Sequence, residues 1–353
     1  MTSSNVLSAS KIKTLQTCTW KYWCSYVLKI PQESNSGASR GWISHLIFEL
    51  LGEKKHYKKY KKIINSGTTY ACNSVYRLIK YHAKKLDVYN EEDMELIDCF
   101  IMRGLLYDFF GKDHKKPSKA ISEQDFNLQI EEDGKSYSMR GFIDKLFIYD
   151  KGSHALIRDF KTSKQKFKGK EITDNLQNLM YCLAVKKLFP KVKTIDVEFL
   201  FLKFSLDSDL LGGDGPGVMK MERISDLELE GFEYQLTAIN DYLDGFTEDD
   251  AKSGYAATQP YPADGTFGGP LACGKEGFKK SRGEFVLDKE GNKIPNFICD
   301  CRLPFDYYEL LDLNGDLVST SKCVPSEVQT GFSVVKKKYP GCPHFFEKNN
   351  FLV

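Results

Sequence analysis

Two short segments of the sequence carry charged side chains on faces that strand-like alternation predicts to be buried. In RGFIDKLFIYD, Asp144 falls on the apolar face, and in ALIRDFKTS, Asp159 and Lys161 do so. Charged groups are costly to bury unless they pair with one another or bind a metal ion. The pattern therefore leaves two interpretations, an Asp–Lys ion pair at the end of a sheet or a site for a metal cation.

Two further pairs of polar residues are spaced four apart in segments with helical periodicity. His45 and Glu49 lie in GWISHLIFELLGE, and Gln177 and Tyr181 lie in TDNLQNLMYCLAVKKLF. Taken alone, the first pair is typical of a core histidine, and the second of a polar helix edge. The ordered series is more specific: Gly41-x3-His45, Gly141-x2-Asp144, Asp159-Phe160-Lys161 and Gln177-x3-Tyr181.

The surrounding elements are of the kind that could position such a series. ISEQDFNLQIEED, SYSMRGFIDKLFIYD and HALIRDFKTS alternate as strands, divided by turn signals at Asp133-Gly134 and Lys151-Gly152. A helix N-capped by Thr173 is predicted next, and the strand TIDVEFLFLKF follows it. Three antiparallel strands, a crossover helix and a further strand predict an α+β core.

This order of motifs resembles the RecB-like branch of the PD-(D/E)XK nuclease superfamily. That branch includes AddB-type and CRISPR-adaptation exonucleases and many phage recombination exonucleases. The resemblance covers about residues 8–205, including the opening helix SASKIKTLQTCTWKY, where Thr19 stands in place of the family's proline. It implies a restriction-endonuclease-like core, in which a central mixed sheet is flanked by helices, with a helical insertion and a C-terminal cysteine-rich metal module.

The resemblance implies a metal-dependent deoxyribonuclease, an exonuclease more than an endonuclease. Phosphodiester cleavage requires charge neutralisation at the phosphate and an activated water. Asp144 and Asp159 supply oxygen ligands suited to Mg²⁺ or Mn²⁺. His45 and the Phe160 carbonyl are predicted as further metal ligands, and Glu49 either contacts a metal-bound water or packs the helix.

The remaining residues of the series are predicted to act on the water and the DNA. Lys161 would orient and help to deprotonate the attacking water and stabilise developing charge. Gln177 and Tyr181 would position the strand by hydrogen bonds or stacking. The segment SKQKFKGKE after Lys161 is either a solvated loop or a phosphate contact through its first lysines, Lys164, Lys166 and Lys168.

The ten cysteines are unevenly distributed, with five in the last quarter of the chain. RecB-like nucleases with a cysteine in the opening helix often bind a [4Fe–4S] cluster through it and three C-terminal cysteines. By this resemblance the ligands are Cys18, Cys273, Cys299 and Cys301. Zinc is an alternative, with ligands drawn also from Cys323 or from Cys342 and His344, and a site without metal is another.

Length and composition limit the classes of protein that remain. The chain has 353 residues, a net charge of +2 and 41% hydrophobic residues, which excludes wholesale disorder and a generic polycation. No stretch approaches the ~18 apolar residues of a membrane span, so no membrane partner and a cytoplasmic location are expected, the host cytoplasm if the protein is phage-encoded. The expected divisions are N-terminal core helices (1–52), a helical insertion (53–120), the catalytic core (121–205), a helix and loops (206–270) and the cysteine-rich module (271–353).

The expected partner is DNA, as single strands or duplex ends, in recombination, repair or phage DNA metabolism. The sequence has no GxxxxGK[ST] motif, so a helicase, if one is needed, is a separate partner, as an annealing protein would be. Ring-forming relatives exist, which leaves an oligomer open. Two alternatives remain: a catalytically weak nucleic-acid-binding module on a nuclease fold, and a CRISPR-type spacer-processing nuclease.

Overall fold

The computed structural model describes residues 5–32, 35–112, 115–207, 215–263, 268–288, 291–325 and 328–346. The chain divides into two compact units. The first unit comprises residues 1–9 and 34–241, and the second comprises residues 10–33 and 242–353. Among the described residues, no helix combines the length and the apolar character that a membrane span requires.

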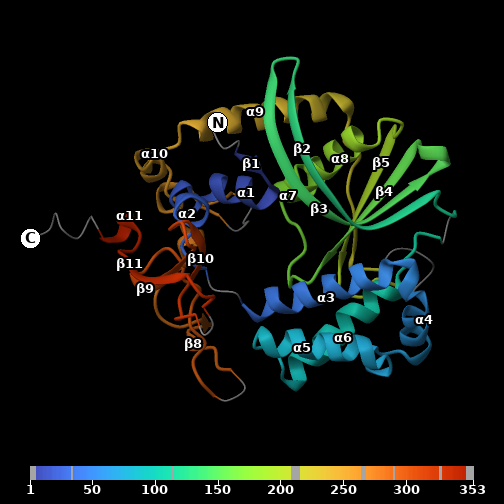
Figure 1. Ribbon diagram of the computed structural model, residues 1–353, viewed down its shortest axis with the longest axis horizontal. Helices are drawn as coiled ribbons and strands as arrows, with labels where there is room; N and C mark the ends of the chain where they lie inside the picture. Colours follow the sequence, from blue (N-terminus) through green and yellow to red (C-terminus); the bar gives the residue numbers. More distant parts are fainter. Residues whose placement is uncertain are drawn as a thin grey trace, which may run out of the picture. The chain divides into compact units, whose positions relative to one another are not determined.

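The first unit is built on a mixed sheet, of which strands β2 to β5 are coloured from green to yellow in Figure 1. Its strand order is β1-β3-β4-β5-β6, and β2 pairs with β3 along nearly its whole length. Strands β2, β3 and β4 are antiparallel neighbours, whereas β5 runs parallel to β4, as expected when a helix connects them. The strands are β1 (Val6–Leu7), β2 (Lys119–Glu132), β3 (Lys135–Tyr149), β4 (His154–Lys161), β5 (Thr194–Phe201) and β6 (Val218–Lys220).

The β2–β3 hairpin forms where its turn residues predict it. Asp133 and Gly134 both have positive φ, 51° and 73°, which a two-residue hairpin turn of this kind requires. Glycine adopts this conformation without cost, and aspartate tolerates it better than most residues. The antiparallel meander expected from the sequence is therefore present.

Helices cover this sheet and carry residues of the predicted series. The helices of the first unit are α3 (Ser36–Gly52), α4 (Tyr57–Ser66), α5 (Asn73–Lys85), α6 (Glu91–Leu106), α7 (Lys170–Thr173), α8 (Leu176–Leu188) and most of α9 (Asp226–Asp244). Figure 1 shows α4, α5 and α6 gathered beside α3. Their apolar faces form one buried cluster with β4, in which Phe48 of α3 stacks on Phe160 at 4.1 Å between ring centroids. This packing fixes α3 against the strand that carries Asp159.

Two local expectations differ from the structure. The helix after β4 does not begin at a Thr173 cap, because Thr173 ends the separate short helix α7. Helix α8 instead begins at Leu176, and the Asn175 side chain accepts the N–H of Asn178 at 3.0 Å. The opening helix expected in SASKIKTLQTCTWKY is not continuous either, since a helix break occurs at Cys18.

A buried ion network ties β4 to β5. The Arg158 guanidinium donates to Glu198 Oε2 at 2.7 Å and to the Asp108 carbonyl at 2.6 Å, and each of the three side chains is at most 10% exposed. We expect Arg158→Ala to lower the free energy of unfolding by about 3–5 kcal/mol, because it leaves the Glu198 carboxylate buried without its cation. Urea unfolding measures this loss.

The matched control is an exposed arginine in the same unit. Arg223 pairs with Asp196 at 2.6 Å, but its side chain is 63% exposed. Exposed ion pairs contribute about 0–1 kcal/mol, so Arg223→Ala should cost far less than Arg158→Ala. Equal losses for the two variants would contradict the structural role given to the buried network.

The second unit combines the N-terminal helices with the C-terminal part of the chain. Trp20 and Tyr339 lie in its apolar core, where the Tyr339 hydroxyl accepts the indole N–H at 2.9 Å and donates to the Cys301 carbonyl at 2.9 Å. Two of its strands, β9 and β10, pair as an antiparallel hairpin. The elements of the second unit are α1 (Ala9–Thr17), α2 (Thr19–Tyr22), a π-helix (Trp23–Val27), α10 (Glu248–Ser253), a 3-10 helix (Gly269–Cys273), β7 (Lys280–Ser281), β8 (Glu284–Phe285), β9 (Phe305–Leu311), β10 (Leu317–Ser321), β11 (Ser333–Tyr339) and α11 (Pro343–Phe346).

Candidate active site

Strands β3 and β4 bring the two predicted aspartates to the same place. Lys145 pairs with Arg158 in the β3–β4 register, so one residue further along the strands Asp144 stands opposite Asp159. Asp144 Oδ2 accepts the backbone N–H of Phe160 at 2.7 Å, which holds its carboxylate beside β4. The alternation that placed both aspartates on one face therefore corresponds to a shared site.

Asp159 lies at the centre of a network formed with α8. Its Oδ1 accepts hydrogen bonds from Tyr181 at 2.7 Å and from the Gln177 amide at 2.9 Å. The Lys161 ammonium lies 2.7 Å from Oδ2 and donates to Gln177 Oε1 at 2.6 Å. The four-residue spacing of Gln177 and Tyr181 thus directs both side chains from one helix face onto β4.

Helix α3 adds His45 to this site. Its Nδ1 lies 3.0 Å from Asp144 Oδ1, and its side chain is 34% exposed. The helix approaches β4 closely at Gly41, where a Cβ atom would meet Thr162 Oγ1 at 2.7 Å. Only glycine permits this approach without displacing Thr162, which explains the Gly41-x3-His45 spacing.

The second glycine of the series has a similar packing role. At Gly141, three residues before Asp144 on β3, a Cβ atom would lie 2.5 Å from Cζ of the buried Phe126 ring. A larger residue would clash with this ring, which packs directly across the β2–β3 pair from Gly141. Both glycines therefore allow close packing around the site and take no part in its chemistry.

Burial and close charges shift the protonation of these groups. Burial raises the pKa of Asp159, opposed by Lys161, and burial together with Asp159 raises the pKa of Tyr181 well above its usual range. Burial alone would lower the pKa of His45, but Asp144 raises it to about 9. His45 is therefore protonated near neutral pH, and to bind a metal ion through Nδ1 it would have to release that proton.

One carboxylate of the site was not foreseen from the sequence. Ser122 pairs with Lys145 and Gln124 with Ile143, so Glu123 of β2 stands opposite Asp144. Glu123 has a φ of 53°, and burial, with the charges of Asp144 and Glu49, raises its pKa to about 7. Like charges opposite each other across strands destabilise a sheet unless a cation neutralises them. Its only signal in the sequence is its place in the strand before Asp144, which the alternation does not single out.

The other predicted residues lie around this centre. Lys164 and Lys168 are exposed on the loop after β4, whereas Lys166 donates to the Pro216 carbonyl at 2.9 Å. Glu49 is exposed, and Tyr181 is 4% exposed, so its hydroxyl is used within the protein. The DNA contacts expected of these residues stay predictions. Among the described residues, no group of three or more His, Cys, Asp or Glu side chains is spaced to hold a metal ion.

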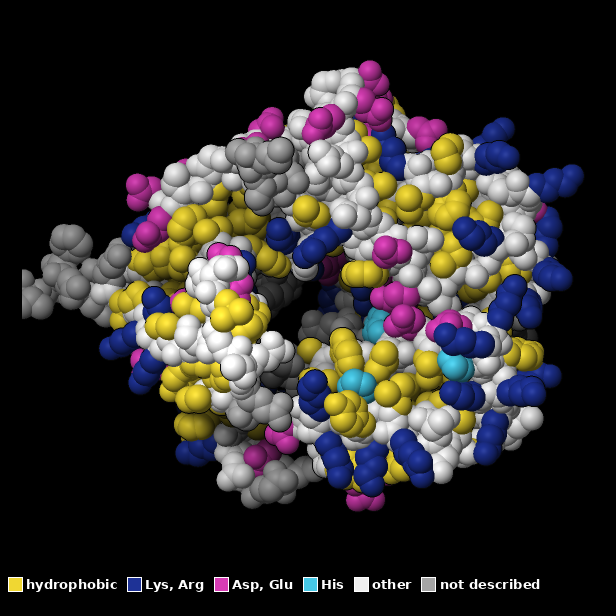
Figure 2. Space-filling model, viewed as in Figure 1, with side chains coloured by type: hydrophobic (Ala, Val, Ile, Leu, Met, Phe, Trp, Pro, Cys, Tyr) yellow, Lys and Arg dark blue, Asp and Glu magenta, His cyan; other side chains and the backbone are white. Residues whose placement is uncertain are grey.

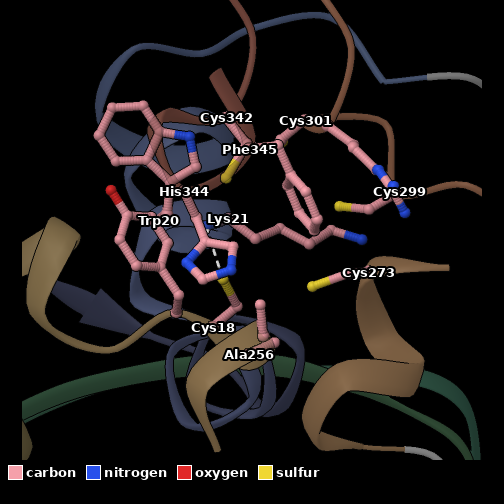
Figure 3. Close-up of a pocket in the computed structure, with 13 residues that line it drawn as sticks. Cys18, Trp20, Lys21, Ala256, Cys273, Cys299, Cys301, Cys342, His344 and Phe345 are labelled. Atoms are coloured by element: carbon pink, nitrogen blue, oxygen red, sulfur yellow. Dashed lines mark hydrogen bonds between the residues drawn. The ribbon is translucent and has the colours of Figure 1, made fainter. Parts of the chain in front are cut away.

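The second unit holds a separate cavity lined by cysteines. Figure 3 shows the sulfur atoms of Cys18, Cys273, Cys299 and Cys342 directed into one space. Cys301 also lines the cavity. Lys21, Arg302, His344 and Phe345 complete its walls with Trp20, Tyr255 and two alanines.

The thiols of the cavity influence one another. Burial raises the pKa of Cys18, that of Cys273 to about 11 and that of Cys342 to about 12, and the negative charges of neighbouring cysteines add to these shifts. The Cys301 thiol is hydrogen-bonded to Cys24 and to Cys299, and Cys24 raises its pKa. All four cysteines of the predicted set thus lie together with Cys342, one of the alternates. Cys323, the other alternate, is exposed and does not line the cavity.

The chain belongs to the PD-(D/E)XK nuclease superfamily, whose family model matches residues 6–251. The protein is thus a nuclease, and the superfamily membership expected from its motifs is confirmed. Nucleases of this superfamily use divalent metal ions such as Mg²⁺.

Comparison with solved structures gives two similar chains. A protein named as a candidate exonuclease from Eubacterium rectale is 9% identical, with a TM-score of 0.41, and the match covers 70% of this chain and 83% of that chain. The protein SSO0001 is 13% identical, with a TM-score of 0.25, and the match covers 64% and 84%. No curated protein matches the sequence.

Proposed function

We propose that this nuclease is a deoxyribonuclease that hydrolyses phosphodiester bonds with Mg²⁺ or Mn²⁺, and that it acts from DNA ends. The observation that carries the proposal is the network in which Lys161 contacts Asp159 and Gln177 beside Asp144 and His45. A purely structural Asp–Lys pair would not need a second aspartate opposite it, nor a histidine. The family membership supports hydrolysis of a nucleic acid backbone.

The residues fit a hard divalent cation. Asp159 Oδ2 is buried and accepts no hydrogen bond of acceptable geometry from the described residues, although the Lys161 ammonium lies 2.7 Å away. With Asp144, His45 and the Phe160 carbonyl, it would complete a set of mainly oxygen donors, which Mg²⁺ and Mn²⁺ prefer. When bound, the ion would neutralise the scissile phosphate and lower the pKa of a water ligand. Glu123 adds negative charge beside this set and so favours cation binding.

The protein's own side chains then supply the remaining catalytic groups. The Lys161 side chain is 24% exposed, so its ammonium can reach a substrate and stabilise the negative charge that develops on the phosphate. Gln177 and Tyr181 fix the orientation of Asp159 by their hydrogen bonds. They would therefore act as positioning residues for the carboxylate, and of the two only the half-buried Gln177 would also contact the DNA strand, because Tyr181 is buried.

DNA is the substrate that the basic loop and the family favour together. The exposed Lys164 and Lys168 follow the catalytic strand directly and could hold phosphates on either side of the scissile bond. The resemblance to RecB-like exonucleases supports action from ends, in recombination, repair or phage DNA metabolism. A separate helicase or annealing protein would supply duplex unwinding or strand annealing.

We also propose that the cysteine cavity binds a [4Fe–4S] cluster, with zinc as the alternative. Several thiols around one cavity form a soft donor set suited to either. The ligands proposed are Cys18, Cys273, Cys299 and Cys342. This set exchanges Cys301 for the alternate Cys342, because the Cys301 thiol is engaged by Cys24. The cluster's role would be to stabilise the second unit.

Replacing Mg²⁺ or Mn²⁺ with Ca²⁺ should separate binding from cleavage. Ca²⁺ binds similar oxygen ligands but accepts a looser geometry, so it should permit DNA binding without turnover. Fluorescence anisotropy of labelled DNA and gel analysis of the same samples measure the two steps. Full cleavage in Ca²⁺ alone, or equal cleavage in EDTA, would contradict the proposed mechanism.

A further inference from the structure

A groove beside the candidate active site exposes aromatic rings. It has a volume of about 620 Å³ and lies between the N-terminal half of α3 and the C-terminal end of α5. Figure 2 shows exposed hydrophobic and histidine side chains, flanked by Lys and Arg, over the region that Figure 1 labels α3 and α5. The lining residues of this α3–α5 groove are Ala38, Ser39, Trp42, His82, Lys85 and Leu86.

The rings of the groove form a continuous surface. Trp42 is 50% exposed, and its ring centroid lies 4.9 Å from that of His82. The ring of Tyr81, which is 60% exposed and lies next to the groove lining, is also 4.9 Å from that of His82. Leaving a tryptophan half-exposed forfeits much of the hydrophobic stabilisation that its burial would give. Such exposed rings are the platforms on which unpaired bases stack.

The groove is continuous with the catalytic residues. Trp42 precedes His45 by three residues on α3, so the two side chains lie on neighbouring parts of one helix face, with Cβ atoms about 5–6 Å apart. Gly41, adjacent to Trp42, contacts Thr162, the residue that follows Lys161. A strand that leaves the site along α3 would therefore meet the Trp42 ring within a few nucleotides.

Cations lie along the same path. Lys85 lines the groove and, together with burial, lowers the pKa of His82, which keeps the His82 ring neutral. Burial and the positive charges of Lys164 and Arg40 lower the pKa of Lys203, so these three cations lie near one another. Arg40 adjoins Gly41, which lies against Thr162, two residues before Lys164. Arg40 pairs with Asp93, whereas Lys164 is exposed. Lysines beside exposed rings are the combination that binds a nucleic acid strand.

We propose that the α3–α5 groove binds the bases of single-stranded DNA by stacking on Trp42 and His82, while Lys85, Lys164 and Lys203 hold its phosphates. Bases in a duplex are stacked on each other and are not available to this surface. The groove therefore makes the nuclease selective for single strands. This proposal deepens the proposed function and rests on it for the identity of the nucleic acid.

The test compares a strand that has bases with one that has none. Binding of fluorescein-labelled oligothymidylate and of an abasic strand of equal length is measured by anisotropy in Ca²⁺, so that no cleavage is needed. The wild-type protein should bind oligothymidylate at least about fivefold more tightly, because base–aromatic stacking has that magnitude per base. Trp42→Ala should reduce oligothymidylate binding to the abasic level, and Trp42→Phe should retain the preference.

Two further variants distinguish base stacking from phosphate binding and from the nonspecific effect of removing an exposed aromatic residue. Lys203→Gln should weaken both strands equally and reduce the slope of log K against log salt by about 0.7, the value of one phosphate contact on a single strand. Tyr234→Ala is the matched control, since Tyr234 is also a 50% exposed aromatic residue on a helix, α9, of the same unit. It should change neither affinity.

Three results would overturn the proposal. They are equal affinity of the wild-type protein for the two strands, equal weakening of both by Trp42→Ala, and a comparable effect of Trp42→Ala on duplex binding. The first of these results is measured on the wild-type protein, so it remains a test of the proposal even if the Trp42→Ala variant does not fold. If the protein prefers strands with bases through Trp42 but cleaves no DNA in Mg²⁺ or Mn²⁺, the binding role of the groove is supported and the nuclease mechanism is rejected. Failure of the groove proposal can therefore be told apart from failure of the proposed function.

Discussion

Lys161→Ala is expected to lower DNA cleavage by about 10²–10⁴-fold while DNA binding in Ca²⁺ is nearly unchanged. The Lys161 ammonium is the cation held 2.7 Å from Asp159 and 2.6 Å from Gln177, at the point where the strand end is open to substrate. Its loss removes a group that stabilises developing charge, whereas binding depends on many phosphate contacts. Single-turnover cleavage of end-labelled DNA and anisotropy in Ca²⁺ measure the two effects.

Lys191→Ala is the control for this variant, because Lys191 is an exposed lysine of the same unit, before β5. It should cleave DNA at the wild-type rate. A thermal unfolding curve for Lys161→Ala shows whether the protein still folds when the buried Asp159 carboxylate has lost this cation. If binding were lost in parallel with cleavage in a folded protein, Lys161 would be a DNA-binding or structural residue and not a catalytic one.

Cys342→Ser is expected to remove the metal of the cysteine cavity and to destabilise the protein by several kcal/mol. Cys342 shares the cavity with Cys18, Cys273 and Cys299, and the binding free energy of a structural thiolate site is also folding free energy, about 10 kcal/mol or more in small domains. Iron, sulfide and zinc analysis of the purified protein, with a thermal unfolding curve, measures the change and decides between a cluster and zinc.

Two other cysteine variants make this prediction specific. Cys301→Ser should keep the metal, since the Cys301 thiol is hydrogen-bonded to Cys24, and Cys323→Ser should behave as wild type because Cys323 is exposed. Loss of metal in Cys301→Ser with retention in Cys342→Ser would restore the ligand set first expected from the sequence. Wild-type protein without iron, sulfide or zinc would reject the metal site.

Local sequence patterns were sufficient to predict strands β2 to β5 and to group most residues of the candidate site. Period-two alternation located β2, β3 and β4, and Asp133-Gly134 located their hairpin, because these signals act within a few residues. Four-residue spacing correctly placed Gln177 and Tyr181 on one face of α8. The PD-(D/E)XK motifs combine these local features, so the superfamily can be recognised from the sequence alone.

The remaining features depend on contacts between distant segments. Glu123 enters the site through its register opposite Asp144 and a left-handed backbone conformation, and neither is encoded in its neighbours. Cys342 joins the cysteine cavity because the fold returns the chain end to α2. The α3–α5 groove combines Trp42 with His82, forty residues apart, and each alone is an ordinary surface residue of a helix.

Cleavage of end-labelled single-stranded and duplex DNA in Mg²⁺ and in Mn²⁺ tests the central claim most directly. The wild-type protein should degrade DNA only with the metal, the product ladder should shorten from one end, and Asp159→Ala, which loses the central carboxylate, should be inactive. The variant also excludes a contaminating nuclease. No cleavage by a wild-type preparation that unfolds cooperatively and contains the metal proposed for its cysteine cavity would contradict the account.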